Sequence, residues 1–263
     1  MKPFAAALLT WIALAATLNA AEEPLRIERI QPQATVTPHA LHKPSTAADR
    51  TALPFFLARA DRIEEREEPM PPGRILRAEH GRMDISPGDV ILIQHPGPLP
   101  TGTTVEILRP GAELKHPTSG EPLGRLIRLL GSARVTGAMA QGSLATVIQA
   151  TREIQTGDQV ALPRPVNTDF TIHDQAPYPL SGVIAHMADD QTEAGAGQVV
   201  VVSLGRRERA VQGLTLPIYR ISPEGMEQRI GSAILFSIGA RASLALLETS
   251  LQPVHIGDTL RAP

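Results

Sequence analysis

The chain has 263 residues, and 25 lysines and arginines nearly balance 27 aspartates and glutamates, which gives a net charge of −2 at pH 7. This balance argues against binding a polyanion through bulk charge, and 3% aromatic residues offer few platforms on which nucleobases could stack. We therefore expect no nucleic-acid partner. The absence of cysteine excludes disulfides, a thiol nucleophile and a lipid-modified N-terminal cysteine.

The first 20 residues have the pattern of a secretory signal peptide. Lys2 supplies the positive charge, residues 4–18 are apolar, and small residues follow at Ala20 and Ala21. We expect cleavage after Ala20, secretion across the inner membrane and a periplasmic location; the alternative is an uncleaved anchor. No later segment is long and apolar enough to predict a membrane span in the mature chain.

Two segments of different composition precede the part of the chain that carries the strand pattern. Residues 21–52 are rich in proline, threonine and polar residues, which predicts a flexible tail. In residues 53–68, apolar side chains recur at helical spacing, which predicts a short amphipathic helix. Its glutamate run is interpreted as a solvated face, and the alternative is an acidic patch for a partner or cation.

Short apolar runs separated by glycine and proline turns follow, and they predict an all-β fold. We expect two tandem homologous small barrel-like domains, over residues 70–163 and 181–263, joined by a proline-rich linker at 164–180. A short strand is expected within that linker, at residues 169–172.

The expectation of two homologous domains depends on a repeat of sequence blocks. "GDVILI" after Pro87 matches "GQVVVV" after Ala196, "GTTVEILR" matches "GLTLPIYR", and "IQTGDQVALP" matches "VHIGDTLRAP". The matches align Gly73 with Gly182 and Arg109 with Arg220. They also align Gly124 with Gly231, which requires about seven extra residues around 138–144 of the first copy. Ordered matches of this kind predict an internal duplication.

Gly-Asp pairs stand before several of the predicted strands. Such a pair suits a tight turn, because glycine tolerates positive φ and aspartate accepts a hydrogen bond from a free backbone N–H. The alternative is a set of carboxylates gathered for acid catalysis or metal binding. We expect the structural role, at Gly88, Asp89, Gly157, Asp158, Gly257 and Asp258.

Longer stretches of the chain carry a family resemblance. "GRILRAEHGRMDISPGDVILI" and "VEILRPGAELKHPTSGEPLGRL" resemble the β domain that lies C-terminal to the LysM module in proteobacterial envelope proteins, as does the stretch from "IYRISPEG" to the final "GDTLRAP". The same domain is similar to the C-terminal part of the flagellar assembly protein T. The resemblance covers most of residues 70–263.

The resemblance implies a cell-envelope location and a non-catalytic β scaffold. Residues 21–69 show no LysM pattern, so direct binding to peptidoglycan is not implied. We expect a non-enzymatic periplasmic scaffold or adaptor protein whose partners are envelope proteins or peptidoglycan. The sequence is compatible with an oligomer. One alternative, from the flagellar likeness, is a ring or accessory component of a flagellar or secretion apparatus.

Motifs of known chemistry are absent from the sequence. There is no G-x-S-x-G turn and no phosphate-binding glycine loop, and the His39/His42 pair has no third ligand nearby. We expect no catalytic residue, no metal and no cofactor; the alternative is a small envelope hydrolase that uses a serine and a histidine distant in sequence.

Five arginines are candidate contacts to a partner or to an anionic polymer. Three lie in "GRRER", and their alternative role is a solvated hairpin tip. The other two occupy equivalent positions in the two copies, and their alternative role is to close a strand end against the Gly-Asp carboxylates. The five are Arg206, Arg207, Arg209, Arg109 and Arg220.

Overall fold

The computed structural model describes residues 53, 61–65, 71–79, 84–187 and 191–262. All of these residues belong to a compact unit formed by residues 43–263. The expected signal peptide and the whole of the expected tail, residues 1–52, lie outside this description. The described part is all-β, as the sequence predicts, with a single turn of 3-10 helix, η4 (Arg206–Glu208), among its named elements.

The first sheet contains seven strands. Six of them pair in a closed cycle, β5-β4-β7-β2-β3-β6, because β5 pairs with β6 as well as with β4; β1 adds to the outer edge of β5. The strands are β1 (Arg62–Glu64), β2 (Gly73–Ala78), β3 (Val90–Gln94), β4 (Thr104–Lys115), β5 (Pro122–Met139), β6 (Gly142–Ala150) and β7 (Gln159–Ala161). We call the six-stranded cycle ring 1.

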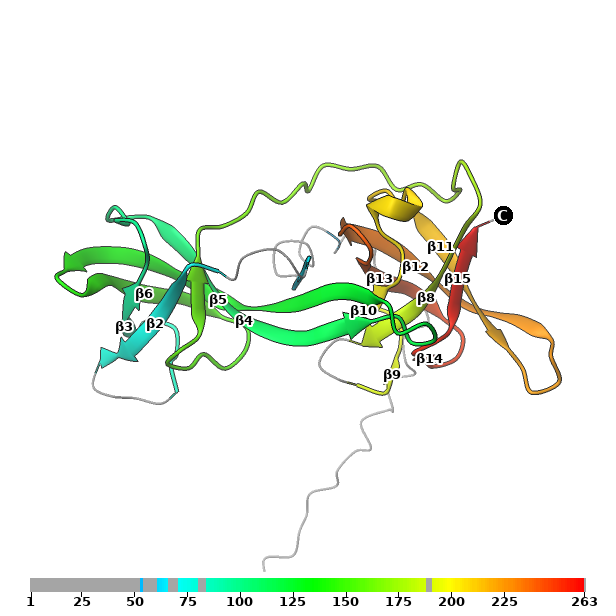
Figure 1. Cartoon of the computed structure of the whole chain (residues 1–263), viewed down its shortest axis with the longest axis horizontal. Coiled ribbons are helices and arrows are strands. Elements are labelled where there is room, and N and C mark those ends of the chain that lie inside the picture. Colours follow the sequence, from blue (N-terminus) through cyan, green and yellow to red (C-terminus); the bar gives the residue numbers. More distant parts are fainter. Residues whose placement is uncertain (1–52, 54–60, 66–70, 80–83, 188–190, 263) are drawn as a thin grey trace, which may run out of the picture. The chain divides into compact units, whose positions relative to one another are not determined.

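The second sheet is a closed barrel of six strands in the order β10-β13-β12-β11-β15-β8, which we call ring 2 (Figure 1). Its strands are β8 (Leu180–Met187), β10 (Val199–Val202), β11 (Thr215–Ile221), β12 (Glu227–Ile238), β13 (Ser243–Ser250) and β15 (Thr259–Ala262). Two short strands, β9 (Glu193–Ala194) and β14 (Val254–His255), pair with each other beside it.

The two rings use the same cycle of antiparallel pairings. Strands β2, β3, β4, β5, β6 and β7 correspond to β8, β10, β11, β12, β13 and β15, and each neighbouring pair in ring 1 has its counterpart in ring 2. The short β9–β14 pairing also has a counterpart, the isolated bridge between Ile85 and Ile154. The all-β class that the alternating pattern predicts is confirmed.

The structure corrects one part of the sequence alignment. Gly131 lies opposite Ile107, and Gly231 lies opposite Ile218, so Gly131 is the counterpart of Gly231 and Gly124 is not. Both glycines face the same obstacle. A Cβ atom would stand 2.1 Å from the carbonyl oxygen of Gln149 in ring 1 and 2.3 Å from that of Thr249 in ring 2. A side chain at either position would collide with the neighbouring backbone.

The extra residues of the first copy lie in the β4–β5 hairpin, not around residues 138–144. Gly131 follows its partner Ile107 by 24 positions, whereas Gly231 follows Ile218 by 13, so this hairpin is 11 residues longer than the β11–β12 hairpin. The spacing from Gly131 to Gly157 equals that from Gly231 to Gly257. The true position of the insertion is not visible in the sequence, because strand residues can lengthen a hairpin without breaking its alternation.

The long hairpin packs on the outside of ring 2 (Figure 1). Its residues Leu114, Leu123 and Leu126 are buried in one hydrophobic cluster with outward-facing residues of ring 2, among them Phe236 and Leu246. Strand β12 is consequently buried on both faces along Ile230–Phe236, whereas β5 alternates. The interiors of the rings form two separate clusters, one in each ring.

Two expectations for the connecting segments are wrong in part. Residues 62–64, within the expected helix 53–68, form strand β1, because their backbone pairs with the outer edge of β5. Leu53 is helical and buried, and residues 54–60 and 66–68 lie outside the described residues. In the linker, residues 169–172 form no strand, and a single parallel bridge joins His173 to Leu214 instead.

Candidate functional site

The Gly-Asp pairs form turns of one design. The φ angles of Gly88, Gly157 and Gly257 are 92°, 95° and 95°, the region that glycine adopts without steric cost. Each following aspartate accepts a hydrogen bond from the backbone N–H three residues before it: Asp89 from Ser86, Asp158 from Gln155 and Asp258 from His255, at 2.9, 2.7 and 2.6 Å. These contacts confirm the predicted turn role.

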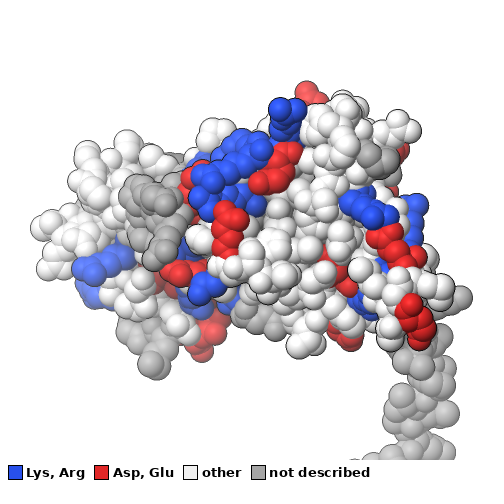
Figure 2. All heavy atoms as spheres, turned by 45° about the vertical axis from the view of Figure 1, so that its right-hand side comes forward, with Lys and Arg blue, Asp and Glu red and all other residues white. Residues whose placement is uncertain are grey.

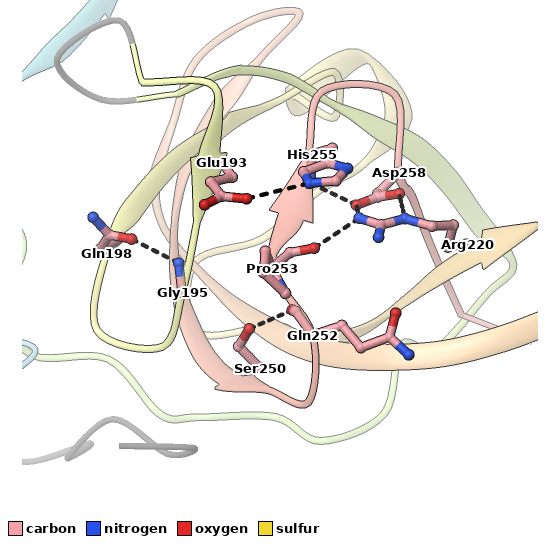
Figure 3. Close-up of polar contacts among 9 residues, drawn as sticks. All are labelled: Glu193, Gly195, Gln198, Arg220, Ser250, Gln252, Pro253, His255 and Asp258. Carbon is pink, nitrogen blue, oxygen red and sulfur yellow. Dashed lines mark hydrogen bonds and ion pairs between the residues drawn. The ribbon is translucent and has the colours of Figure 1, made fainter. Parts of the chain in front are cut away.

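A fourth turn completes the set with a different residue. At the position in ring 2 that corresponds to Asp89, Gln198 accepts a hydrogen bond from the N–H of Gly195 through its Oε1 at 2.6 Å (Figure 3). A neutral amide oxygen therefore does the work of the carboxylate. The turn itself therefore needs only a hydrogen-bond acceptor, which a neutral side chain can supply.

In ring 1, Arg109 on β4 binds the aspartate of the turn before β7. Its Nε and Nη2 donate to the two carboxylate oxygens of Asp158 at 2.7 and 2.8 Å, and Nη2 also donates to the Glu153 carbonyl at 3.2 Å. The Asp158 side chain is only 5% exposed. The hydrogen bonds from the guanidinium to Asp158 raise the pKa of Arg109.

Ring 2 repeats this arrangement between β11 and the turn before β15. Arg220 donates from Nε and Nη2 to the two oxygens of Asp258 at 2.8 and 2.6 Å, and from Nη2 to the carbonyl of Pro253 at 2.8 Å (Figure 3). The pKa of Arg220 is raised by its hydrogen bonds to Asp258. We call each arginine–aspartate pair a clamp, because it fastens two neighbouring strands of its ring.

The clamps decide the role of four predicted site residues. Bidentate contact occupies the planar fork of the guanidinium and both oxygens of the carboxylate. Each carboxylate lies in its own ring and is paired there, so the clamps do not bring the acidic groups of the two rings together into one pocket. Arg109, Arg220, Asp158 and Asp258 therefore fit a structural role, which was the alternative considered for the two arginines.

The remaining three arginines lie on and after η4, and all three are exposed. Arg206 donates to the carbonyl of Ile238 at 2.6 Å, and the guanidinium of Arg209 lies 5.7 Å from the centre of the Tyr178 ring. The turn is held by its backbone, since the N–H groups of Arg206 and Arg207 donate to carbonyls of the β12–β13 connection. The side chain of Arg207 is exposed on the surface.

Arg206 also lines a charged hollow, a cavity of about 380 Å³. Sequence reasoning missed this site, because its walls come from segments that lie far apart in the sequence. They include residues 61–65, the middle of β4, the middle of β5, linker residues 164–167, and the end of β12 with the turn that follows.

A network of ion pairs fills this region. Arg62 contacts Glu106 at 2.9 Å and lies 3.3 Å from Glu64; the buried Glu64 also binds Arg164 at 2.8 Å. Arg62 Nε, which is buried, makes an ion pair but has no hydrogen-bond partner among the described residues. Burial raises the pKa of Glu106, and the charge of Arg62 partly opposes that effect.

The network is balanced in charge. Four carboxylates, on Asp61, Glu64, Glu65 and Glu106, face four guanidinium groups, on Arg62, Arg152, Arg164 and Arg206. Figure 2 shows the same character on the surface it draws, where acidic and basic side chains lie beside one another. A balanced network holds segments together and creates no strong field for a charged substrate. Its main effect is to fix residues 61–65 on the hairpin.

His255 and Ser232 each contact a carboxylate, but not the same one. His255 and Glu193 are 3.6 Å apart, but both side chains are about half exposed (Figure 3). Ser232 contacts Thr249 at 2.8 Å and Glu248 at 3.1 Å, and neither of these partners is a histidine. Over the part of the chain that the structure describes, no three histidine and carboxylate side chains are grouped for a metal ion. His39 and His42 lie outside it.

Within the described ranges, no helix has the length and hydrophobicity that crossing a membrane requires. No family model matches the sequence, and no curated protein is detectably similar to it.

Proposed function

We propose that the protein is a non-enzymatic scaffold or adaptor of the cell envelope, exported to the periplasm and associated with peptidoglycan or with an envelope assembly. The single observation that carries the proposal is the use of its polar residues. Arg109, Arg220 and the three aspartates of the Gly-Asp pairs are engaged in clamps and turns, which is the use expected in a scaffold. The signal-peptide pattern and the LysM-associated resemblance support the envelope location.

We also infer that the two rings descend from one duplicated module. The repeated cycle of pairings, the two clamps and the two glycines at closest approach support this inference. Chance would have to reproduce a bidentate contact, a carbonyl acceptor and a glycine at corresponding positions. Duplication followed by lengthening of one hairpin accounts for all of them together.

Cosedimentation of residues 21–263 with purified peptidoglycan sacculi tests the association with peptidoglycan. We expect the protein in the pellet and a weaker signal for Arg207→Glu, because this exposed side chain has no clamp role. Arg134→Glu, on an exposed position of β5, is the matched control and leaves binding unchanged. If nothing sediments, cross-linking in intact cells must recover an envelope protein instead; failure of both would contradict the proposal.

The export step has its own test. Cell fractionation of the complete chain should place it in the periplasm, and a chain without residues 1–20 should stay in the cytoplasm. The hydrolase alternative is tested with a serine-reactive probe, and specific labelling of one serine would favour that alternative over the scaffold.

A second candidate function is a ring or accessory component of a flagellar or secretion apparatus. The observation that favours it is an exposed strand edge on β12, since open edges are a common means of assembly between chains. Such a component forms oligomers, so light scattering at increasing concentration tests it.

A further inference from the structure

Each ring carries a hollow, and the two hollows lie at corresponding places. In ring 1 the hollow is bordered by β2, β3 and β7, and in ring 2 by their counterparts β8, β10 and β15. The volumes are about 540 and 350 Å³. The first is lined by residues 71–74, 94–96, 157 and 159. The second is lined by residues 181–183, 203, 207, 208, 241 and 259, together with residues 116, 121 and 123 of the long hairpin.

A glycine occupies the same position in both linings. Gly73 pairs with Val160 of β7, and Gly182 pairs with Leu260 of β15, so the two glycines are counterparts. Neither position has room for a side chain. A Cβ atom would stand 2.8 Å from the carbonyl oxygen of Val160 at the first, and 2.4 Å from Cγ of Leu204 at the second. Since the hollow and its glycine occur in both copies, we regard the hollow as a feature of the repeated module.

In the hollow of ring 2, the side chain of Arg207 is not engaged by its neighbours. Arg241 is occupied, because its Nη1 donates to Glu121 at 2.7 Å, and Glu208 accepts the N–H of Gly205 at 2.9 Å. Over the described ranges, the Arg207 guanidinium has neither a carboxylate partner nor a hydrogen-bond acceptor. Its surroundings also offer short hydroxyl side chains, those of Ser181, Ser203 and Thr259.

The hollow of ring 1 holds a corresponding cation. Arg74 is the one lysine, arginine, aspartate or glutamate among the residues that line it. Its Nε donates to Oε1 of Gln94 at 3.1 Å, and within the part of the chain that the structure describes no carboxylate pairs with it. Oε1 of Gln159, in the same lining, is buried and has no hydrogen-bond partner among the described residues. This hollow therefore combines an uncompensated guanidinium with an acceptor that lacks a donor.

We propose that each hollow binds the terminal carboxylate of a peptide, through Arg74 in ring 1 and through Arg207 in ring 2. A guanidinium binds a carboxylate by two parallel N–H···O bonds, which the free Nη groups of both arginines can supply. The amide N–H beside such a carboxylate is the kind of donor that Oε1 of Gln159 lacks. The inference rests on the proposed association with peptidoglycan, and it assigns recognition to the peptides, which carry free carboxylates, and not to the glycan strands.

The charges of the hollows favour a singly charged group over a dianion such as phosphate. Each hollow offers one guanidinium that is not already paired, and the hollow of ring 2 also contains the carboxylates of Glu121 and Glu208. A second negative charge on the ligand would therefore be repelled without a cation to balance it. A carboxylate carries the single charge that one arginine neutralises.

Two sites in one chain strengthen a contact that is weak at each site. An exposed arginine gains little from one carboxylate in water. When both hollows bind the same polymer, the second contact is intramolecular, and the apparent affinity can exceed that of one site by a factor of about 10²–10⁴. A polymer with many peptide ends is the kind of partner that two such sites suit.

Nuclear magnetic resonance on residues 21–263 with labelled arginine tests the sites directly. The probe is N-acetyl-alanyl-alanine, compared with the same dipeptide as its C-terminal amide. The free acid should shift the Nε–H signals of Arg74 and Arg207, and the amide should not. Arg74→Met and Arg207→Met should each remove the response of one hollow and leave the other, and the matched control Arg134→Met should leave both. Equal responses to acid and amide, no response to either, or a stronger response to inorganic phosphate would overturn the proposal.

Cosedimentation separates this inference from the proposed function. Sacculi whose peptide carboxylates have been converted to amides should bind the wild-type chain at least about tenfold more weakly than untreated sacculi, because both contacts are lost together. Arg74→Met/Arg207→Met should bind untreated sacculi just as weakly. Equal binding of the wild type to both preparations would overturn the peptide sites and leave the scaffold function standing. A response to the free dipeptide without binding to sacculi would support the sites and contradict the association with peptidoglycan.

Discussion

Arg109 and Asp158 are 49 positions apart in sequence, and the guanidinium of the first contacts both carboxylate oxygens of the second, at 2.7 and 2.8 Å. The contact joins β4 to the turn that begins β7, at the point where ring 1 closes. Arg220 and Asp258 repeat it in ring 2. A ring of short strands has few ladder hydrogen bonds at each seam, so a bidentate ion pair there fixes the register of a strand only three residues long.

Substitution of the clamp arginine should destabilise the fold. Arg109→Met leaves Asp158 buried without its charged partner, and we expect a loss of about 1–3 kcal/mol in the free energy of unfolding. Arg109→Lys keeps the charge but not the fork, so it should recover only part of the loss. Urea titration followed by circular dichroism measures each change.

The exposed Arg134→Met is the matched control and should change stability little. A double-mutant cycle of Arg109→Met with Asp158→Asn isolates the pair itself. A coupling energy near zero would show that the contact does not stabilise the ring, and the structural interpretation of the clamp would then be wrong.

The close approach at Gly131 and Gly231 predicts that neither position accepts a side chain. Alanine at Gly131 would place its Cβ atom 2.1 Å from the Gln149 carbonyl oxygen, so the strands must separate. We expect a loss of about 1–3 kcal/mol for each substitution. Gly137→Ala, on the same strand β5 with nothing within 4 Å of its Cβ position, is the control and should be neutral or slightly stabilising.

The packing of the long hairpin on ring 2 predicts a large effect from a residue outside both ring interiors. Leu114 is 2% exposed, and Leu114→Ala should cost about 2–5 kcal/mol because it leaves a cavity between the hairpin and β12. Leu162→Ala, at a position that is 51% exposed, is the control. Equal and small effects from both would contradict the buried position of the hairpin.

The raised pKa of Glu106 gives one contribution to stability a definite dependence on pH. Burial raises this pKa above its ordinary value of 4.5, so the folded chain binds a proton at Glu106 more readily than the unfolded chain does. The stabilising contribution of the protonated carboxyl is therefore present below pH 4.5 and is lost as the pH rises through the raised pKa.

Glu106→Gln removes this titration. We expect the difference in unfolding free energy between wild type and variant to change across this pH range in favour of the variant as the pH increases. Carboxylates that are ion-paired elsewhere in the chain make the free energy of unfolding rise with pH. This contribution is the same in wild type and variant, so it cancels in the difference between them. Thermal melts in a pH series measure it, with Glu113→Gln as an exposed control on the same strand. A difference that does not vary with pH would rule out the titration.

The sequence by itself determined the strands, the turns and the correspondence of Arg109 with Arg220. Each of these depends on a local rule: alternation of apolar side chains, positive φ at glycine, and an acceptor three residues after a free N–H. The same rules predict a helix over residues 53–68, because the spacing of apolar residues in a segment carries no information about a distant strand edge with which the segment can pair. Residues 62–64 became β1 only because β5 offered that edge.

Tertiary structure alone decided where the hairpin extension lies, which arginine meets which aspartate, and how Asp61, Glu106 and Arg164 come together. These contacts join segments between 44 and 100 positions apart, so no window along the chain contains both partners. The equivalence of Gly131 and Gly231 could not be read from the sequence for the same reason. Their equivalence depends on the carbonyl that each one faces, and that carbonyl belongs to the neighbouring strand.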